Sequence, residues 1–145
     1  MKKILLTMCA CIMLAISFTG CGIKASQKLT LEDFYNKSED VRKAFDDDAA
    51  EVLRAQDCPF SDVSYKVVGN ELDAIYTLKN KMPIEYKPMF EAALGNQLVI
   101  KSQSQVNTLR LHTSHLSDDP IIMKTIVKNP DGAIFYEYTY TEPTE

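Results

Sequence analysis

Two tight-turn signals constrain the fold of this 145-residue chain more than any other feature of its sequence. Gly69-Asn70 and the segment Asn129-Pro130-Asp131-Gly132 each separate two runs in which apolar and polar residues alternate. Alternation on both sides of a glycine-containing turn is typical of a β-hairpin. The sequence therefore predicts hairpins over residues 62–79 and 121–141.

A helical pattern precedes the first hairpin. Apolar residues recur at helical spacing over residues 30–56. Thr30 and Ser38 are both candidate N-caps, because each hydroxyl side chain stands just before an acidic first turn. We therefore expect a broken or kinked helix over residues 30–56, ended by Cys58-Pro59.

A second helical pattern lies between the hairpins. Pro88 suits the first turn of a helix, and apolar residues at helical spacing follow it. The segment 101–105 within this pattern is polar. We expect a helix over roughly residues 88–115 with a break near residues 101–105.

This order of elements, αββαββ, predicts an α+β fold. Its simplest architecture is a four-stranded antiparallel sheet with both helices packed on one face. Tyr136, Tyr138 and Tyr140 alternate along the last strand, and we expect them on the other, open face. An exposed aromatic face often marks a binding site, which makes these tyrosines the candidate binding residues. Tyrosine is also common in strands simply because it packs well on a sheet.

The first twenty residues predict a secretory leader. Two lysines precede an apolar run from Ile4 to Ile16, which is shorter than the about twenty residues that span a bilayer. The following segment, Ser17-Phe18-Thr19-Gly20-Cys21, resembles the lipobox of bacterial lipoproteins, although Phe18 replaces the usual Leu. The resemblance implies that the Cys21 thiol receives a diacylglycerol and becomes the new N-terminus. The alternative is an ordinary signal peptide cleaved nearby.

The predicted leader determines the domain organisation and the cellular location that we expect for the protein. We expect a signal peptide at residues 1–20, a lipidated tether at 21–28, one α+β domain at 29–141 and a polar tail at 142–145. Two acyl chains on Cys21 would hold the domain stably on the outer side of the cell membrane. Removal of Lys2 and Lys3 takes the formal net charge from −4 to −6. This acidic balance argues against nucleic acid as a partner.

Cysteine usage is consistent with this organisation. Cys9 and Cys11 leave with the leader, and lipid occupies Cys21. Cys58 then remains alone in the domain, so no intramolecular disulfide can form. We expect Cys58 to be a small buried hydrophobe, while a reactive thiol or an intermolecular bridge is the alternative.

Two clusters of polar residues are candidates for metal binding. His112 and His115 are spaced i, i+3 near Asp118 and Asp119, which makes a metal site conceivable. Histidines at a helix end more often interact with the helix C-terminus or with solvent. In the run Asp46-Asp47-Asp48, consecutive helix positions diverge, so we expect solvated surface. The sequence predicts no metal site, no cofactor and no catalytic residue.

Three segments carry a resemblance to a known family. They are Thr-Leu-Glu-Asp-Phe-Tyr at 30–35, Val-Val-Gly-Asn-Glu-Leu at 67–72, and Ile-Ile-Met-Lys-Thr-Ile-Val-Lys-Asn-Pro-Asp-Gly-Ala-Ile-Phe-Tyr-Glu-Tyr at 121–138. With the lipobox, this pattern resembles a family of small, uncharacterised lipoproteins of Gram-positive bacteria. The resemblance implies a lipidated single α+β domain and brings no catalytic residues.

The sequence therefore predicts a non-catalytic, membrane-anchored binding module rather than an enzyme. Its expected partner is an envelope protein or peptide bound at the open sheet face or at a sheet edge. The alternative is a small-ligand-binding or sensory module with its pocket between the helices and the sheet. The sequence leaves the partner and the oligomeric state open.

Overall fold

The fold is that of a computed structural model, which describes residues 28–113 and 115–143. The predicted leader, Cys21 and nearly all of the predicted tether lie outside the described residues. In the part of the chain that is described, no helix is long and apolar enough to cross a membrane.

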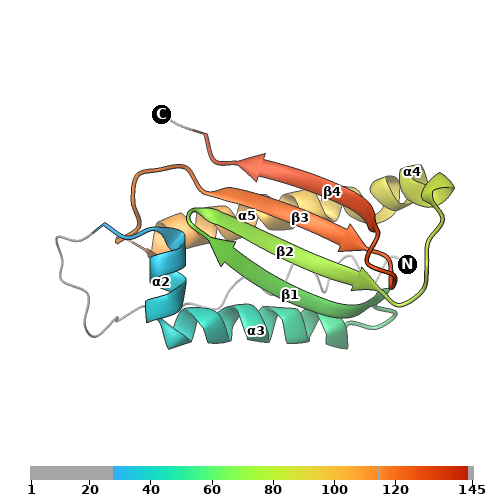
Figure 1. The fold of residues 1–145 in the computed structure, drawn as a ribbon, viewed down its shortest axis with the longest axis horizontal. Coiled ribbons are helices and arrows are strands. Elements are labelled where there is room, and N and C mark those ends of the chain that lie inside the picture. The colour runs from blue at the N-terminus through green and yellow to red at the C-terminus, as the bar shows by residue number, and fades with distance from the viewer. Residues whose placement is uncertain (1–27, 114, 144–145) are drawn as a thin grey trace.

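Four strands form one sheet in the order β1-β2-β3-β4 (Figure 1). Their bounds are Phe60–Val68 for β1, Glu71–Leu78 for β2, Ile122–Lys128 for β3 and Ile134–Thr141 for β4. Both predicted hairpins are present, and Gly69 has a φ of 59° in the first turn, where glycine is favoured. The α+β prediction is confirmed.

The prediction of a purely antiparallel sheet is wrong, because β2 and β3 pair in parallel. The chain leaves β2 at one end of the sheet, and the second long helix carries it back along the sheet before β3 begins (Figure 1). A helix that returns the chain in this way lets the next strand run in the same direction as the previous one.

The helices follow the predicted pattern, except that the break in the second helix lies at another position. Their bounds are Leu31–Lys37 for α2, Glu39–Arg54 for α3, Lys87–Phe90 for α4 and Asn96–His112 for α5. The break between α2 and α3 is confirmed, since the Ser38 hydroxyl accepts a hydrogen bond from the Val41 N–H. The second break lies at a π-helical segment, Glu91–Gly95, and not near residues 101–105.

Segment 101–105 stays helical because its polar side chains have partners inside the protein. Lys101, Ser102 and Gln105 are all buried. Lys101 pairs with Asp48 of α3, and Ser102 shares a hydrogen bond of 2.7 Å with Thr125 of β3. The polar stretch thus faces the core and does not interrupt the helix.

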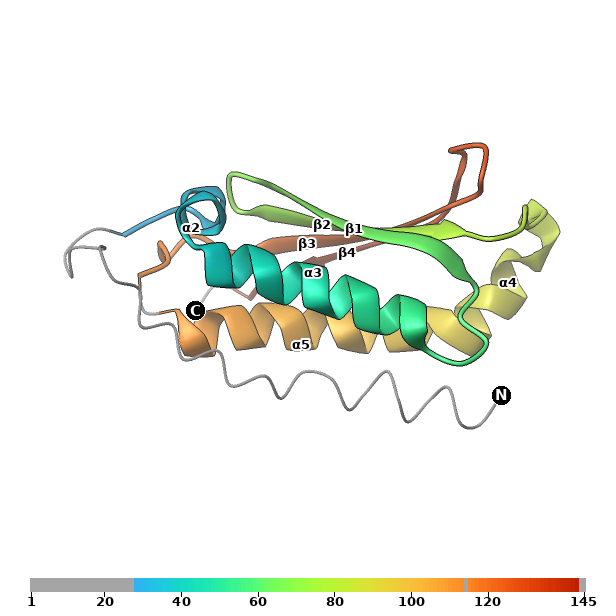
Figure 2. The same ribbon diagram turned by 90° about the horizontal axis from the view of Figure 1, so that it is seen from below.

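The two long helices lie on one face of the sheet (Figure 2). α3 contacts β1, and α5 contacts β3 and β4. The prediction of two helices was incomplete, because α2 and α4 add two short helices at opposite ends of the sheet (Figure 1). The core between the layers is built from apolar side chains of every long element, among them Val41, Phe45, Val52, Phe60, Leu72, Tyr76, Leu98, Val106, Met123 and Val127.

The predicted tyrosines lie on the face that the helices cover. Tyr136 is buried, and Tyr138 and Tyr140 are partly buried against the core. Their cross-strand partners on β3 are Val127, Thr125 and Met123, which are all buried. The expectation that these tyrosines form an open aromatic platform is therefore wrong. They face inward because the apolar side chains of β3 face that way.

The uncovered face of the sheet is polar. A bulge between Val127 and Lys128 shifts the register, so that Phe135 and Tyr136 are both buried while Ile134 is exposed. The exposed side of the sheet carries charged residues and threonines around three half-buried isoleucines, and its members include Lys66, Glu71, Asp73, Ile75, Ile122, Lys124, Ile126, Glu137 and Thr139. The Lys124 ammonium and the Glu71 carboxylate form an ion pair of 2.8 Å there.

Candidate functional site: an apolar groove

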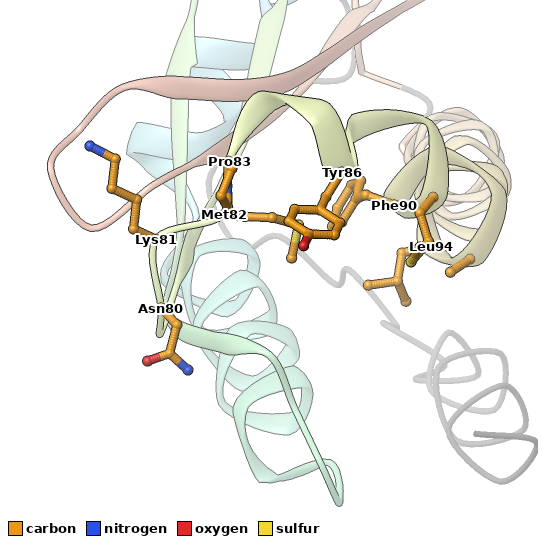
Figure 3. A pocket seen from close by; sticks show the side chains of 9 residues that line it. Asn80, Lys81, Met82, Pro83, Tyr86, Phe90 and Leu94 are labelled. Carbon is orange, nitrogen blue, oxygen red and sulfur yellow. The ribbon is translucent and has the colours of Figure 1, made fainter.

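A groove with a volume of about 420 Å³ opens at the end of the molecule where α4 lies (Figure 3). One wall is the loop that follows β2, and the other is α4 with the π-helical segment. The groove is lined by Asn80, Lys81, Met82, Pro83, Tyr86, Met89, Phe90, Ala93 and Leu94. Most of these side chains are apolar. We call the concavity that these nine residues line the groove.

The loop wall of the groove is held by the turn between β3 and β4. Asn129 is buried, and its side chain bonds both backbone groups of Met82: the Met82 N–H donates to Oδ1 at 2.8 Å, and Nδ2 donates to the Met82 carbonyl at 3.1 Å. The Lys81 ammonium also pairs with the Asp131 carboxylate at 2.7 Å. Asn129 and Asp131 belong to the predicted turn signal, which therefore supports the groove as well as the hairpin.

The helical wall is held by aromatic packing. Phe90 is buried, and its ring lies edge-on to Phe135 with 5.3 Å between the ring centroids. Its ring centroid also lies 5.6 Å from that of Tyr136. Burial raises the pKa of Tyr136 above its usual value. Of the three predicted tyrosines, Tyr136 supports the groove from beneath, while Tyr138 and Tyr140 lie farther along β4.

The backbone of the helical wall departs from regular α-helix. Glu91–Gly95 forms one turn of π-helix between α4 and α5. Wide turns of this kind are rare and occur frequently at functional sites. This turn carries Ala93 and Leu94, so the irregular backbone is part of the groove.

Large apolar side chains are exposed at the groove. Met89 is 68% exposed, Ile84 65% and Tyr86 46%. Ile84 begins the short 3-10 turn that leads into α4. Tyr86 (Figure 3) and Met89 line the groove. Exposed apolar surface next to a concavity is typical of an interaction site. Methionine suits such a surface because its flexible, polarisable side chain adapts to different contacts.

A second unusual cluster lies inside the protein, between α3, α5 and β1. We call Asp48, Tyr65, Lys101 and Gln105 the buried polar cluster. The Lys101 ammonium lies 2.8 Å from an Asp48 carboxylate oxygen, to which the Tyr65 hydroxyl also donates a hydrogen bond. Gln105 Nε2 donates to the Tyr65 hydroxyl at 3.1 Å. The side chain of Lys101 is 8% exposed and that of Asp48 is 17% exposed.

Electrostatics tie this cluster to the folded state. Burial raises the pKa of Tyr65 well above its usual value, and the negative charge of Asp48 raises it further. Burial likewise raises the pKa of the neighbouring Tyr76. A carboxylate, an ammonium and a phenol are groups that can exchange protons. Here all three are engaged with one another, in the layer between the helices and the sheet. The arrangement connects α3 and α5 to each other and to β1.

Asp48 corrects the expectation that the aspartate run is solvated. Asp46 and Asp47 are exposed as expected, and Asp47 forms an ion pair with Lys43 one helical turn away. Asp48 instead points to the layer between the helices and the sheet. The three aspartate side chains point in different directions, as expected, and that of Asp48 points toward the sheet.

The residues of the conceivable histidine site have other contacts. Asp118 pairs with Lys28 at 2.7 Å, and the hydrogen bond from Lys28 lowers the pKa of that carboxyl. The backbone carbonyl of His115 accepts a hydrogen bond from the Leu29 N–H at 2.8 Å. The side chain of His112 lies outside the described residues. Among the residues that are described, no three His, Cys, Asp or Glu side chains gather to hold a metal ion.

Cys58 is buried, as expected. Its Sγ lies 3.7 Å from the backbone carbonyl oxygen of Phe60, at the start of β1. The thiol thus packs where the chain passes from α3 into the sheet.

The groove is not among the sites predicted from the sequence, although the sequence contains a signal for it. Between Met82 and Met89 the helical and strand periodicities both stop, two prolines occur, and yet apolar residues continue. Apolar residues without a periodicity have no predicted sheet or helix face to explain them. Comparisons with protein-family models, curated proteins and solved structures find no match to this chain.

Proposed function

We propose that this protein is a non-catalytic binding module that holds an apolar segment of an envelope protein in the groove. The observation that carries this proposal is the set of exposed side chains at the groove, with Met89 68% exposed beside Tyr86. Their exposure costs solvation free energy, at about 25 cal/mol for each Å² of apolar surface in water. A partner that covers them recovers this free energy.

The lining of the groove favours an apolar partner segment. Polar groups are sparse along it, and the Lys81 ammonium already bonds Asp131. A partner that inserts leucine, phenylalanine or methionine side chains loses no strong hydrogen bonds to water on binding. The charged pairs Lys81–Asp131 and Lys87–Glu91 border the apolar surface and suit the polar rim of an interface.

The position of the groove is compatible with the proposed membrane anchor. The described chain begins at Lys28 near α2, at the end of the sheet opposite to α4 (Figure 1). A tether from Cys21 would therefore join the domain far from the groove and leave the groove accessible. Replacing Cys21 with Ala should release the protein from the membrane or block its maturation. A variant that stays fully membrane-bound in cell fractionation contradicts the anchor.

A small apolar ligand is the second candidate, because a volume of about 420 Å³ falls in the range of small-molecule pockets. Small-ligand sites usually add a few converging polar groups that fix the orientation of the ligand. Here the polar lining residues are Asn80, Lys81 and Tyr86, and Lys81 already forms an ion pair with Asp131. Thermal-shift screening of the purified protein distinguishes the two, since a ligand that raises Tm favours the pocket.

Site-specific photo-crosslinking in intact cells tests the proposed function. A photoreactive amino acid replaces Met89 in one variant and Ile100, a 59%-exposed apolar residue on α5, in the matched control. We expect a discrete crosslinked product from position 89 and none of the same mass from position 100. The product should weaken when Tyr86→Ser is added. Equal products from both positions, or no product from position 89, contradict the proposal.

A further inference from the structure

The outer edge of β4 offers backbone groups that no other described strand uses. β4 is the last strand of the sheet, and β3 is its partner on the inner side. The Glu142 N–H bonds the Ile121 carbonyl at 3.0 Å in the register of the pair. Antiparallel pairs alternate between bonded and unbonded residues, so Tyr140, Tyr138 and Tyr136 direct their backbone groups to β3. Glu137, Thr139 and Thr141 direct theirs outward.

This edge has few of the features that keep exposed strands apart. Native edge strands are commonly protected by lysine, proline or a very short length. β4 has eight residues, Ile-Phe-Tyr-Glu-Tyr-Thr-Tyr-Thr, with Glu137 as its one charged member. β1, the strand at the opposite edge, carries Asp62 and Lys66 and has α3 packed beside it. The β4 edge is therefore the better of the two for strand addition.

From this edge we propose that two copies of the chain pair through β4, antiparallel, with Thr139 facing Thr139 of the second copy. In this register Glu137 lies opposite Thr141 of the other copy. Every outward N–H and C=O of Glu137, Thr139 and Thr141 then finds a partner. The two sheets join into one continuous sheet around a twofold axis.

Two other registers, with the axis at Glu137 or at Thr141, are less favourable. An axis through Glu137 would place two carboxylates directly opposite each other, which is destabilising. An axis two residues farther along, at Thr141, would place Thr139 opposite Pro143, which has no N–H to donate. With the axis at Thr139, a threonine hydroxyl faces each glutamate, and the two threonines at the centre are a favourable cross-strand pair.

The helix-facing side of β4 supports the same pairing. Tyr138 of one copy lies opposite Tyr140 of the other, so two tyrosine pairs flank the axis. Both residues are only partly buried in the single copy. Cross-strand aromatic pairs stabilise antiparallel strand pairing. The dimer thus gives Tyr138 and Tyr140 an interface role that is independent of the groove.

Disulfide trapping tests this register in the full chain. We expect Thr139→Cys, treated with an oxidant in the cell fraction that holds the protein, to give a dimer on a non-reducing gel. Thr141→Cys is the matched control, since it is exposed on the same strand face. In this register the two Thr141 positions are four residues out of step, roughly 13 Å apart, beyond the reach of a disulfide. The unsubstituted chain controls for its own cysteines.

A proline substitution tests the pairing without a crosslink. Thr139→Pro removes an outward N–H that β3 does not use, which an edge strand tolerates. We expect the thermal unfolding midpoint of this variant to lie within a few degrees of that of the Thr139→Val control. Light scattering should show that the proline variant is monomeric. Thr139→Val should remain dimeric. A Thr139→Cys chain that forms no dimer, a Thr141→Cys chain that forms as much, or a monomeric unsubstituted chain would overturn the proposal, whatever the groove binds.

Discussion

The buried polar cluster and the groove both depart from the usual rule that polar residues lie outside and apolar residues inside. Inside the protein, Asp48 and Lys101 are withdrawn from water. At the surface, Met89 and Tyr86 stand in water. The two regions differ in where their partners are. The buried charges bond each other and Tyr65, whereas the Met89 and Tyr86 side chains are covered only in part by their own chain.

This difference separates a structural role from a binding role. Removing one member of a buried ion pair destabilises the folded state, because it leaves an uncompensated buried charge. An exposed apolar side chain contributes little to folding, so its removal has little effect on stability. Substitutions in the cluster should therefore change stability, and substitutions in the groove should change binding.

The largest expected effect is at Lys101. Lys101→Met should lower the free energy of unfolding by about 3–5 kcal/mol, because the Asp48 carboxylate is left without its cation. Urea unfolding measures this loss. The double variant Asp48→Leu/Lys101→Met should recover at least half of it, since no charge is then left unpaired. A single variant as stable as the unsubstituted protein would show that water solvates Asp48.

A smaller effect is expected at Tyr65. Tyr65→Phe removes the hydroxyl that donates to Asp48 and accepts from Gln105, at a cost of about 1–3 kcal/mol. Tyr86→Phe is the matched control, because it makes the same chemical change on an exposed ring of the groove. We expect Tyr86→Phe to leave the urea midpoint unchanged. Equal losses of stability in the two variants would contradict the distinction between a structural cluster and a binding groove.

Alkaline pH should weaken the buried polar cluster selectively. The pKa of Tyr65 is raised in the folded state by burial and by Asp48. Its contribution is therefore present below the pKa of an unfolded tyrosine, about 10, and declines as the pH rises above that value. Urea midpoints between pH 8 and pH 11 should fall more for the unsubstituted protein than for Tyr65→Phe. Parallel curves would contradict this assignment.

Much of the fold follows from local signals in the sequence. Thr30 and Ser38 cap helices where the sequence places a hydroxyl side chain before an acidic turn, and Gly69-Asn70 closes the first hairpin. These features depend on a few neighbouring residues, so the sequence displays them. The parallel pairing of β2 with β3 depends on the path of α5, which no short segment encodes.

The faces and the sites were harder to predict. Alternation shows that Tyr136, Tyr138 and Tyr140 share a face but not which face, because tyrosine suits both water and the core. Asp48 and Lys101 pair although they are far apart in the chain, so local sequence alone does not show why the polar segment 101–105 stays helical. The groove arises where a loop meets a helix, and its signal was apolar residues without a period.

The smallest expected change in stability is at the groove. Met89→Ser should alter the free energy of unfolding by less than about 0.5 kcal/mol, which is usual for surface positions. Ile100→Ser on α5 is the matched control, since Ile100 is also an exposed apolar residue. A loss above about 2 kcal/mol at Met89 alone would place its side chain in the core and remove the basis for the binding proposal.

Oxidation of Met89 in intact cells tests the central claim most directly. Peroxide should oxidise Met89 readily in the purified protein, because the side chain is 68% exposed, while Met123, at 1% exposure, resists. A chain with Ile100→Met supplies an exposed reference in the same molecule. Measured by mass spectrometry against this reference, Met89 should oxidise several-fold more slowly in cells than after purification. Equal relative rates in the two conditions would contradict the proposal that a partner covers the groove.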